Sequence, residues 1–226
     1  MRVAVDKGVD IISMSWTIER TDRNKADIDA LQQAVELAAR ANILMFCAAT
    51  DQGAYRDRTY PAASGTKKIF KIGAAEASGA AHKWLGDQSA VDFIMPGHQV
   101  VVERHDDRNV AKFTPLTGSS VATALASGLA AVILYCVQLG GIVKADGNQK
   151  AEALVSQRYA DLRQHDRMKQ AFQAIGLDPA SEHKFVTVWQ RFGLKDSQTL
   201  KNAGSEDKDR WILLLADLAD DLMRAL

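Results

Sequence analysis

Hydrophobic residues over the first 140 positions follow two alternating spacings. Short apolar runs rich in β-branched residues, typical of buried strands, lie at Val9–Ser15, Ile43–Ala49, Ile69–Ala74 and Val91–Met95. Between the first two runs, apolar residues recur every three or four positions, which predicts an amphipathic helix from Ala26 to Ala41. Apolar strands interleaved with such a helix indicate a parallel sheet covered on both faces. The predicted fold class is α/β.

The pattern changes after Gly140-Gly141. From there on, apolar residues keep helical spacing among many charged ones, which predicts helices joined by loops. Glycine and proline mark the expected helix ends. These ends are Gly176, Asp178-Pro179 and Gly193, and the last expected helix is Asp209–Leu226. We therefore predict two parts, a sheet domain over residues 1–140 and a helical C-terminal appendage over residues 141–226.

The longest apolar run, Val121–Val137, has the composition of a membrane span but not the length. It is shorter than the ~20 residues that cross a bilayer, and it contains Thr123, Ser127 and Gly128. We therefore predict a buried core helix. The sequence has 28 basic and 28 acidic residues, and this balance offers no electrostatic reason to bind nucleic acid or an anionic membrane.

Two features bear on location. Cys47 and Cys136 each lie in an apolar run, so we expect both to fill the core as thiols in a reducing compartment. The N-terminal stretch MRVAVDKGVD has no long apolar region behind it, so no signal peptide is visible. Both features favour a cytoplasmic protein.

Gly118-Ser119-Ser120 stands at the start of the long apolar run and is the most informative candidate site. A serine at a helix start accepts backbone N–H groups, which is ordinary capping. The same position exposes the hydroxyl to the positive end of the helix dipole, which suits an anionic intermediate. The local pattern alone allows both interpretations of Ser120.

Six blocks of this sequence resemble, in order and spacing, the C-terminal part of the domain of subtilisin-like serine proteases. The blocks are VDIISMSW (9–16), ILMFCAATDQGA (43–54), TYPAAS (59–64), IGAAE (72–76), DFIMPG (92–97) and GSSVATALASGLAA (118–131). The form of the last block, and the later VTVWQRFG segment, look most like fungal members. The resemblance implies a three-layer α/β fold with the serine block on a central buried helix, and with the N-terminal strands of the family's sheet missing from this sequence.

The resemblance also implies roles for individual residues. Ser120 stands at the nucleophile position of the family's serine block. Asp51 stands at the oxyanion-hole position, where the family has asparagine. Ser15, Trp16 and Thr17 form the end of the strand that lines the substrate cleft. Trp16 is expected either in the cleft wall or packed in the core.

The sequence departs from the family in its catalytic triad, which should present an aspartate, a histidine and the serine in that order. The family's histidine lies in a His-Gly motif, and none of the five histidines here precedes glycine. Asp6-Lys7-Gly8 has the family's Asp-x-Gly spacing, but it directly adjoins the strand at Val9 instead of lying well upstream. We interpret Gly8 as a helix terminator and Asp6 as a solvent-exposed residue.

Two further departures affect the cleft. An ionised Asp51 only accepts hydrogen bonds, and its charge repels a developing oxyanion. Loss of one oxyanion donor lowers turnover about 10²–10³-fold and loss of the base about 10⁶-fold, both figures having been measured in subtilisins. Thr17 and Ile18 replace glycines that the family has after the serine, and their side chains would crowd a substrate strand.

No cofactor or metal is predicted. His105-Asp106-Asp107 is expected to be a polar loop, because adjacent residues rarely converge on one ion. No loop has the spacing of calcium-binding oxygens. Glycine-rich phosphate-binding motifs are absent from the sequence.

The favoured hypothesis is therefore a subtilisin-like serine endopeptidase domain that is inactive as this chain, with a polypeptide as substrate. The alternative is a pseudo-protease that binds an extended peptide along Ser15–Thr17. A third class, an unrelated α/β small-molecule domain, would be favoured if the strands at Val9 and Ile43 were not parallel neighbours. Neither nucleic acid nor membrane is an expected partner, and further domains in a longer protein stay open.

Overall fold

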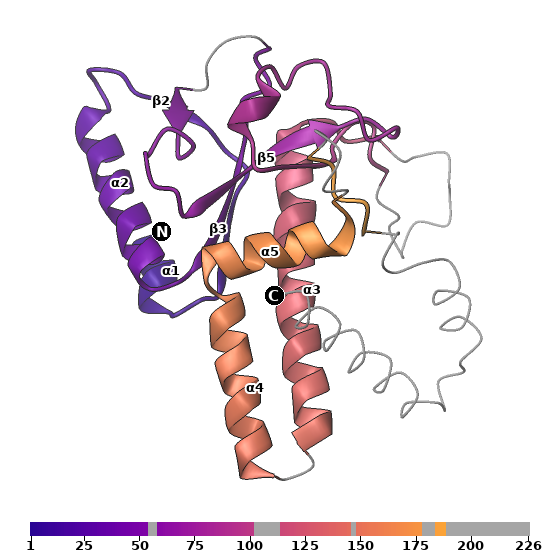
Figure 1. Cartoon of the computed structure of the whole chain (residues 1–226). Helices are drawn as coiled ribbons and strands as arrows, with labels where there is room; N and C mark the ends of the chain where they lie inside the picture. The colour runs from indigo at the N-terminus through magenta and orange to yellow at the C-terminus, as the bar shows by residue number, and fades with distance from the viewer. Residues whose placement is uncertain (54–57, 102–113, 146–147, 178–183, 189–226) are drawn as a thin grey trace. The chain divides into compact units, whose positions relative to one another are not determined.

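The computed structural model describes residues 1–53, 58–101, 114–145, 148–177 and 184–188 (Figure 1). The chain forms two compact units, Met1–Ser127 and Gly128–Leu226. The division falls within the long helix α3 (Ser119–Ala145). The boundary expected between residues 140 and 141 stays a prediction.

The first unit contains a parallel sheet of four strands in the order β1-β3-β5-β6. Its helices and strands are α1 (Arg2–Asp6), β1 (Ile11–Met14), β2 (Ile18–Glu19), α2 (Lys25–Arg40), β3 (Leu44–Ala48), β4 (Thr59–Tyr60), β5 (Ile69–Ala75), the 3₁₀ turn η1 (Gln88–Ala90) and β6 (Phe93–Pro96). The predicted α/β class is confirmed, and the four sheet strands lie where the apolar runs predicted them. Ile11 pairs with Leu44 in parallel register, so the strands at Val9 and Ile43 are neighbours and the third class loses its support.

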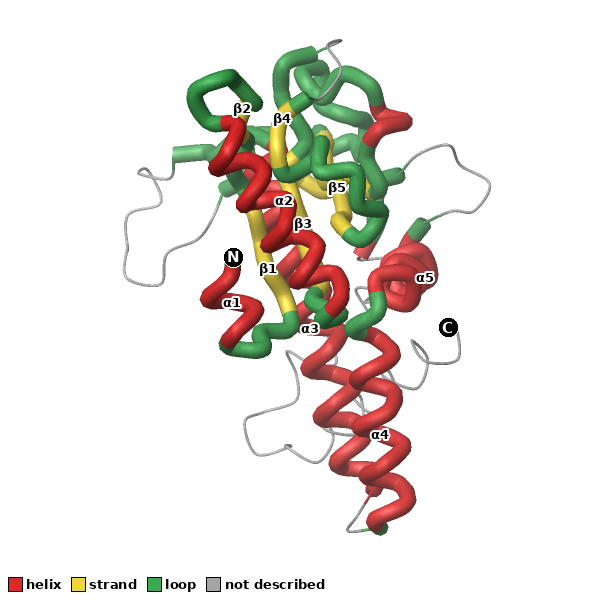
Figure 2. The backbone as a smooth tube through the Cα atoms, turned by 90° about the vertical axis from the view of Figure 1, so that its left-hand side faces the viewer, coloured by secondary structure: helices red, strands yellow, loops and turns green. Residues whose placement is uncertain are grey.

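Helix α2 covers one face of this sheet. Its buried residues Val35 and Ala38 pack in one cluster with Met14, Met45 and Cys47 from β1 and β3. Figure 2 shows α2 running beside these two strands. The helical spacing of apolar residues in the sequence therefore marks the face that α2 buries against the sheet.

The other face of the sheet carries Ser13, Phe46 and Phe70. These residues are partners across β1, β3 and β5, and partners in register point to the same side. The Ser127 hydroxyl, in α3, donates a hydrogen bond to the Ser13 hydroxyl at 3.1 Å. The first turns of α3 thus lie on the face opposite α2, which gives the three layers that the family resemblance implied.

The length predicted for this helix was wrong. Over Ser119–Val143, 25 residues with a mean hydropathy of 2.0, α3 is long and apolar enough to cross a membrane by length and composition alone. Half of its most apolar window is buried within the protein. Ala122 and Ala126 are fully buried, which fits the predicted core helix for the first turns of α3.

The chain before β1 confirms the interpretation of the Asp6-Lys7-Gly8 motif. Helix α1 ends at Asp6, which is exposed to solvent. Gly8 has a φ of 63°, a left-handed conformation that glycine adopts without strain, and its N–H donates to the Val5 carbonyl at 2.9 Å. Gly8 is therefore a helix terminator.

The second unit is mostly helical where it is described. It contains the rest of α3, α4 (Gln149–Leu162) and α5 (His165–Gly176). A Cβ built at Gly141 would lie 2.4 Å from a Val155 methyl carbon, so α3 and α4 approach closely there. The Thr187 hydroxyl donates to the Gly176 carbonyl at 2.6 Å, at the helix end that the sequence predicted. The expected end at Gly193 and the expected helix Asp209–Leu226 lie outside the described residues.

Both cysteines are buried thiols, as predicted. Cys47 lies in β3 of the first unit and Cys136 in the part of α3 that belongs to the second. Burial raises the pKa of the Cys136 thiol, because a low-dielectric environment disfavours the thiolate. We therefore expect Cys136 to be unreactive in the folded chain.

Candidate functional site

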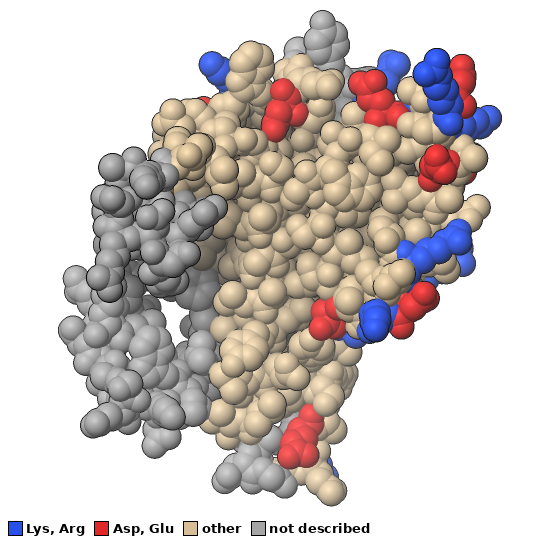
Figure 3. Space-filling view, turned by 180° about the vertical axis from the view of Figure 1, so that it is seen from behind, with Lys and Arg blue, Asp and Glu red and all other residues tan. Residues whose placement is uncertain are grey.

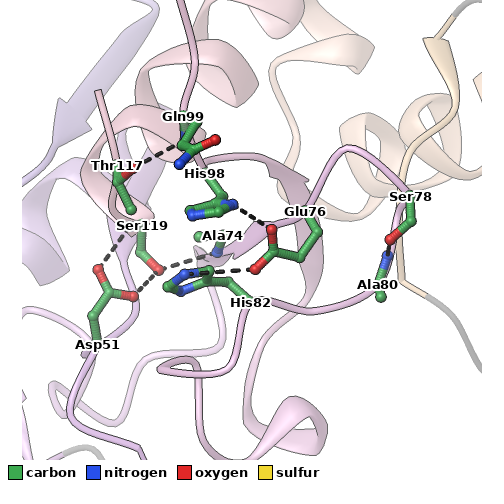
Figure 4. A network of polar contacts seen from close by, with 10 residues as sticks. All are labelled: Asp51, Ala74, Glu76, Ser78, Ala80, His82, His98, Gln99, Thr117 and Ser119. Carbon is green, nitrogen blue, oxygen red and sulfur yellow. Dashed lines mark hydrogen bonds and ion pairs between the residues drawn. The ribbon is translucent and has the colours of Figure 1, made fainter. Parts of the chain in front are cut away.

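The turn after β3 brings Asp51 to the N-terminus of α3 (Figure 4). The Ser119 backbone N–H donates to Oδ2 of Asp51 at 2.8 Å, and the Ser119 hydroxyl donates to Oδ1 at 2.6 Å. A helix N-terminus leaves its first N–H groups without intrahelical partners and carries a partial positive charge. The Asp51 carboxylate satisfies one of these donors and is stabilised by that charge, so Asp51 caps α3 from 68 residues away in sequence.

Ser119 connects this cap to the sheet. Its hydroxyl oxygen also accepts the backbone N–H of Ala74, in β5, at 3.1 Å. Ser119 is fully buried, and the Thr123 hydroxyl donates to its carbonyl at 2.7 Å. The Ser119 hydroxyl is thus held by two hydrogen bonds, one to Asp51 in the turn after β3 and one from Ala74 in β5.

Ser120, the predicted nucleophile, follows directly and is half-buried. The Ser15 hydroxyl donates to the Ser120 carbonyl at 3.1 Å, which holds the end of β1 against the start of α3. A Cβ built at Gly118 would lie 3.3 Å from the Ser120 hydroxyl and 3.4 Å from Oδ2 of Asp51, and Gly118 has a φ of 140°. Glycine therefore suits this position through both its conformation and its close contacts. The structure brings Ser120, Asp51 and Ser15 together at the start of α3, and the catalytic roles that the resemblance implies for them stay predictions.

Ser15, Trp16 and Thr17 form an exposed segment between β1 and β2. Trp16 is 39% exposed, so it is not a packed core residue. The role of this segment in binding a substrate stays a prediction.

A second polar cluster, which sequence reasoning missed, consists of Glu76, His82 and His98. Glu76 Oε2 contacts Nδ1 of His98, and Glu76 Oε1 lies 3.6 Å from Nε2 of His82. The two imidazole rings are 4.7 Å apart at their centroids. One nitrogen or oxygen from each of the three side chains lies within 4.8 Å of the others, so the group has the donors for a metal ion. We call these three residues the histidine cluster.

A usable signal for this cluster existed in the sequence. Glu76 comes directly after β5, and His98 comes two residues after the end of β6. Adjacent parallel strands end at the same edge of a sheet, where α/β proteins bind their ligands. Polar residues at those two strand ends, taken together, would have predicted the pair.

The described residues contain no hydrogen bond between the Ser120 hydroxyl and a histidine. His82 and His98 both contact Glu76 instead. Within the described part of the chain, the Ser120 hydroxyl therefore has no histidine as a hydrogen-bonded partner.

Residues 1–140 match the Subtilase family, so the chain belongs to that family. The "Major intracellular serine protease" of Bacillus subtilis (strain 168) is 29% identical over 134 residues, which cover 58% of this chain and 38% of the relative. The "Intracellular serine protease" of Paenibacillus polymyxa is also 29% identical over 134 residues, 58% of this chain and 37% of the relative. The chain thus spans less than two thirds of the length of these relatives.

Solved structures share the fold. A lanthipeptide protease has a TM-score of 0.58 at 17% identity, with 84% of this chain and 62% of that chain covered. The self-cleaved protease domain of PatA has a TM-score of 0.56 at 24% identity, with 87% and 65% covered. These likenesses support the three-layer α/β architecture and the helical C-terminal part.

Proposed function

We propose that this chain carries the nucleophile of a subtilisin-like serine endopeptidase domain and does not hydrolyse peptide bonds as this polypeptide alone. The observation that carries the proposal is the hydrogen-bonded contact of the Asp51 carboxylate with Ser119, next to Ser120. Membership of the Subtilase family supports the protease class.

The contact bears on catalysis because of where charge develops. Attack by the Ser120 hydroxyl on a peptide carbonyl would generate an oxyanion beside the start of α3. Stabilising it requires hydrogen-bond donors aimed at that oxygen. An ionised Asp51 supplies acceptors only and adds a negative charge, so it raises the barrier where the family's asparagine would lower it.

We further propose that the chain corresponds to the C-terminal part of the family's domain, that it is most similar to fungal members, and that it acts in the cytoplasm. The six blocks and their order support the first point. The names of the two bacterial relatives, both intracellular proteases, support the location. The mass of the native polypeptide tests the first point: a species above 24.7 kDa with Asp-x-Gly and His-Gly motifs upstream of Met1 would supply a complete triad.

Fluorophosphonate labelling followed by peptide mass analysis tests the inactivity. We expect no adduct on Ser120, because no described base activates its hydroxyl. Stoichiometric labelling that disappears in Ser120→Ala would contradict the proposal. Hydrolysis of a fluorogenic peptide by the chain, lost in the same variant, would contradict it independently of the probe.

A second candidate function is peptide binding without cleavage. Ser15–Thr17 is exposed, continues from β1, an edge strand of the described sheet, and is hydrogen-bonded to Ser120 through Ser15. Extended peptides bind such edges by adding a strand. Fluorescence polarisation with a library of extended peptides tests this: Trp16→Ala should weaken binding, and Trp84→Ala, which removes a tryptophan that is 53% exposed elsewhere in the same unit, should not.

The proposed partners are accordingly a polypeptide substrate or a peptide ligand, together with any further domains of a longer protein, and not nucleic acid or a membrane. On the face seen in Figure 3, basic and acidic side chains are interspersed and no basic patch forms. The first turns of α3 support the exclusion of a membrane, since Ser119, Thr123 and Ser127 make hydrogen bonds within the protein. No cofactor is proposed for peptide hydrolysis.

A further inference from the structure

The histidine cluster lies at the carboxyl edge of the sheet and is held there by backbone hydrogen bonds to β5. The His82 N–H donates to the Ala74 carbonyl at 2.9 Å, and the Gly97 N–H donates to the Ala75 carbonyl at 3.0 Å. A Cβ at Gly97 would lie 2.6 Å from Cβ of Ala74, so the chain leading to His98 runs directly against β5. Two histidines from separate loops are thereby fixed beside Glu76, which follows β5 itself.

The spacing of the donor atoms fits a small metal ion. Zinc ligands at about 2.1 Å in tetrahedral geometry lie about 3.4 Å from one another. Nε2 of His82 is 3.6 Å from Oε1 of Glu76, and one donor atom from each of the three residues lies within 4.8 Å of the other two. Tetrahedral ligation therefore requires the most distant of these atoms to move closer by about 1.4 Å or less.

Burial of His82 is the second observation that points to a ligand. Its side chain is 3% exposed, its Nε2 faces Oε1 of Glu76, and its Nδ1 has no hydrogen-bond partner within the described chain. Buried polar atoms in proteins nearly always have partners. The 3.6 Å between Nε2 of His82 and Oε1 of Glu76 is longer than a hydrogen bond, so the two groups leave room for an ion between them, whereas the unpaired Nδ1 lies on the other side of the ring.

We propose that Glu76, His82 and His98 bind a divalent zinc-type ion, through one carboxylate oxygen and two imidazole nitrogens. This donor set suits zinc, whereas calcium and magnesium prefer oxygen ligands throughout. Three protein ligands leave the fourth tetrahedral position to water. The site differs from that of Ser120 and does not depend on the chain's being a protease.

We expect ion binding to stabilise the end of β5, which contacts the start of α3. Ala74 is the shared residue: its carbonyl accepts from His82, and its N–H donates to the Ser119 hydroxyl. Figure 4 shows Ala74 between Ser119 and the histidine cluster. An ion that draws Glu76, His82 and His98 together would fix the end of β5, and through it the start of α3.

Titration of the chelator-treated full chain with Zn²⁺ alone, by calorimetry, tests the proposal. We expect one saturable equivalent and a rise in the melting temperature that grows with Zn²⁺ concentration. Co²⁺ in place of Zn²⁺ should give the visible absorption of a four-coordinate nitrogen and oxygen site. Glu76→Gln and His98→Gln should each weaken binding by at least about tenfold and remove the melting-temperature shift.

His98 and Glu76 are the preferred positions because their side chains are 31% and 32% exposed, so their substitution disturbs the packed interior less than that of His82, whose side chain is 3% exposed. The matched control is His105→Gln, which removes a histidine beside two aspartates in sequence and should keep the full equivalent of Zn²⁺. The proposal is overturned by any of three results: no saturable binding, binding unchanged in both cluster variants, or binding lost in His105→Gln.

Discussion

Two polar groups lie at the carboxyl edge of the same sheet and differ in how completely the protein satisfies them. In the Asp51 cap, which comprises Asp51, Ser119 and the Ala74 N–H, both carboxylate oxygens and the serine hydroxyl have protein partners between 2.6 and 3.1 Å. In the histidine cluster, a buried imidazole nitrogen of His82 has none within the described residues. The first group is explained by the stability of the fold, whereas the second contains a buried polar atom that the described protein leaves unpaired.

Asp51 is therefore more than a residue that replaces the asparagine of the family's oxyanion hole. Its carboxylate caps the start of α3, and both of its oxygens accept a hydrogen bond there. The same feature that opposes an oxyanion therefore stabilises the helix that carries Ser120. Stability and catalysis make opposite demands on one side chain.

Gly97→Ala should have the largest effect on the free energy of unfolding, because Gly97 lies between the Asp51 cap and the histidine cluster. The added Cβ would lie 2.6 Å from Cβ and 2.9 Å from Cα of Ala74, and 3.0 Å from the Gly118 carbonyl oxygen. Backbone atoms on two sides prevent an easy adjustment, so we expect the free energy of unfolding to fall by about 1–3 kcal/mol. Chemical denaturation measures it.

The matched control is Gly128→Ala, where the new Cβ meets no atom within 4 Å. Gly128 lies inside α3, so alanine should raise the free energy of unfolding by roughly 0.5–1 kcal/mol through helix propensity. Equal effects of the two substitutions would show that Gly97 is not held tightly between Ala74 and Gly118, and the two groups would then not share a rigid edge.

Asp51→Ala should have the second largest effect on the free energy of unfolding. It leaves the Ser119 N–H at the start of α3 without its acceptor and the buried Ser119 hydroxyl without its own, at a cost of about 1–2 kcal/mol. Asp51→Asn keeps one side-chain oxygen and should cost less. Thermal or denaturant melts of the three chains measure the series, and an Asp51→Ala chain as stable as the parent would remove the structural explanation of this carboxylate.

The sequence predicted the sheet because its signal is local. The run Ile43–Ala49 is apolar throughout and is buried throughout; the strand it predicts needs no knowledge of partners. Ser120 and Asp51 could be placed because each stands in a block whose order along the chain is informative. The contact of Asp51 with Ser119 could not be predicted from the sequence, because it depends on how the turn after β3 meets α3 in space.

The histidine cluster was missed for the same reason. His82-Lys83 and Gly97-His98 have no motif around them, and their convergence on Glu76 depends on the register that pairs Ile72 of β5 with Phe93 of β6. A one-residue shift of that register would turn the side chains to the other face. Three residues spread over 23 positions become a site only when the sheet is known.

His82→Leu in the presence of a chelator should change stability little, by less than about 1 kcal/mol. The variant loses the 3.6 Å contact of Nε2 with Glu76 but no hydrogen bond from Nδ1, and it places an apolar side chain in a buried position. The lost contact and the added apolar burial therefore nearly offset each other. Denaturant melts of the variant and the parent, with and without Zn²⁺, distinguish the stability of the metal-free chain from the stability added by the ion. A loss as large as that of Asp51→Ala in the metal-free chain would mean that the cluster is as complete as the Asp51 cap, and the contrast between them would fail.

Ser120→Ala should have the smallest effect on the free energy of unfolding, although Ser120 is next to Ser119, whose hydroxyl is part of the Asp51 cap. The Ser120 hydroxyl is half-buried and makes no hydrogen bond within the described residues, so its loss should change the free energy of unfolding by no more than about 0.5 kcal/mol. Ser119→Ala provides the contrast, because it removes the acceptor of the buried Ala74 N–H and a donor to Asp51. Parallel melts of the two alanine variants measure the difference. If Ser120→Ala proved as destabilising as Ser119→Ala, Ser120 would be a structural residue as well, and its hydroxyl would not be the free group that a nucleophile requires.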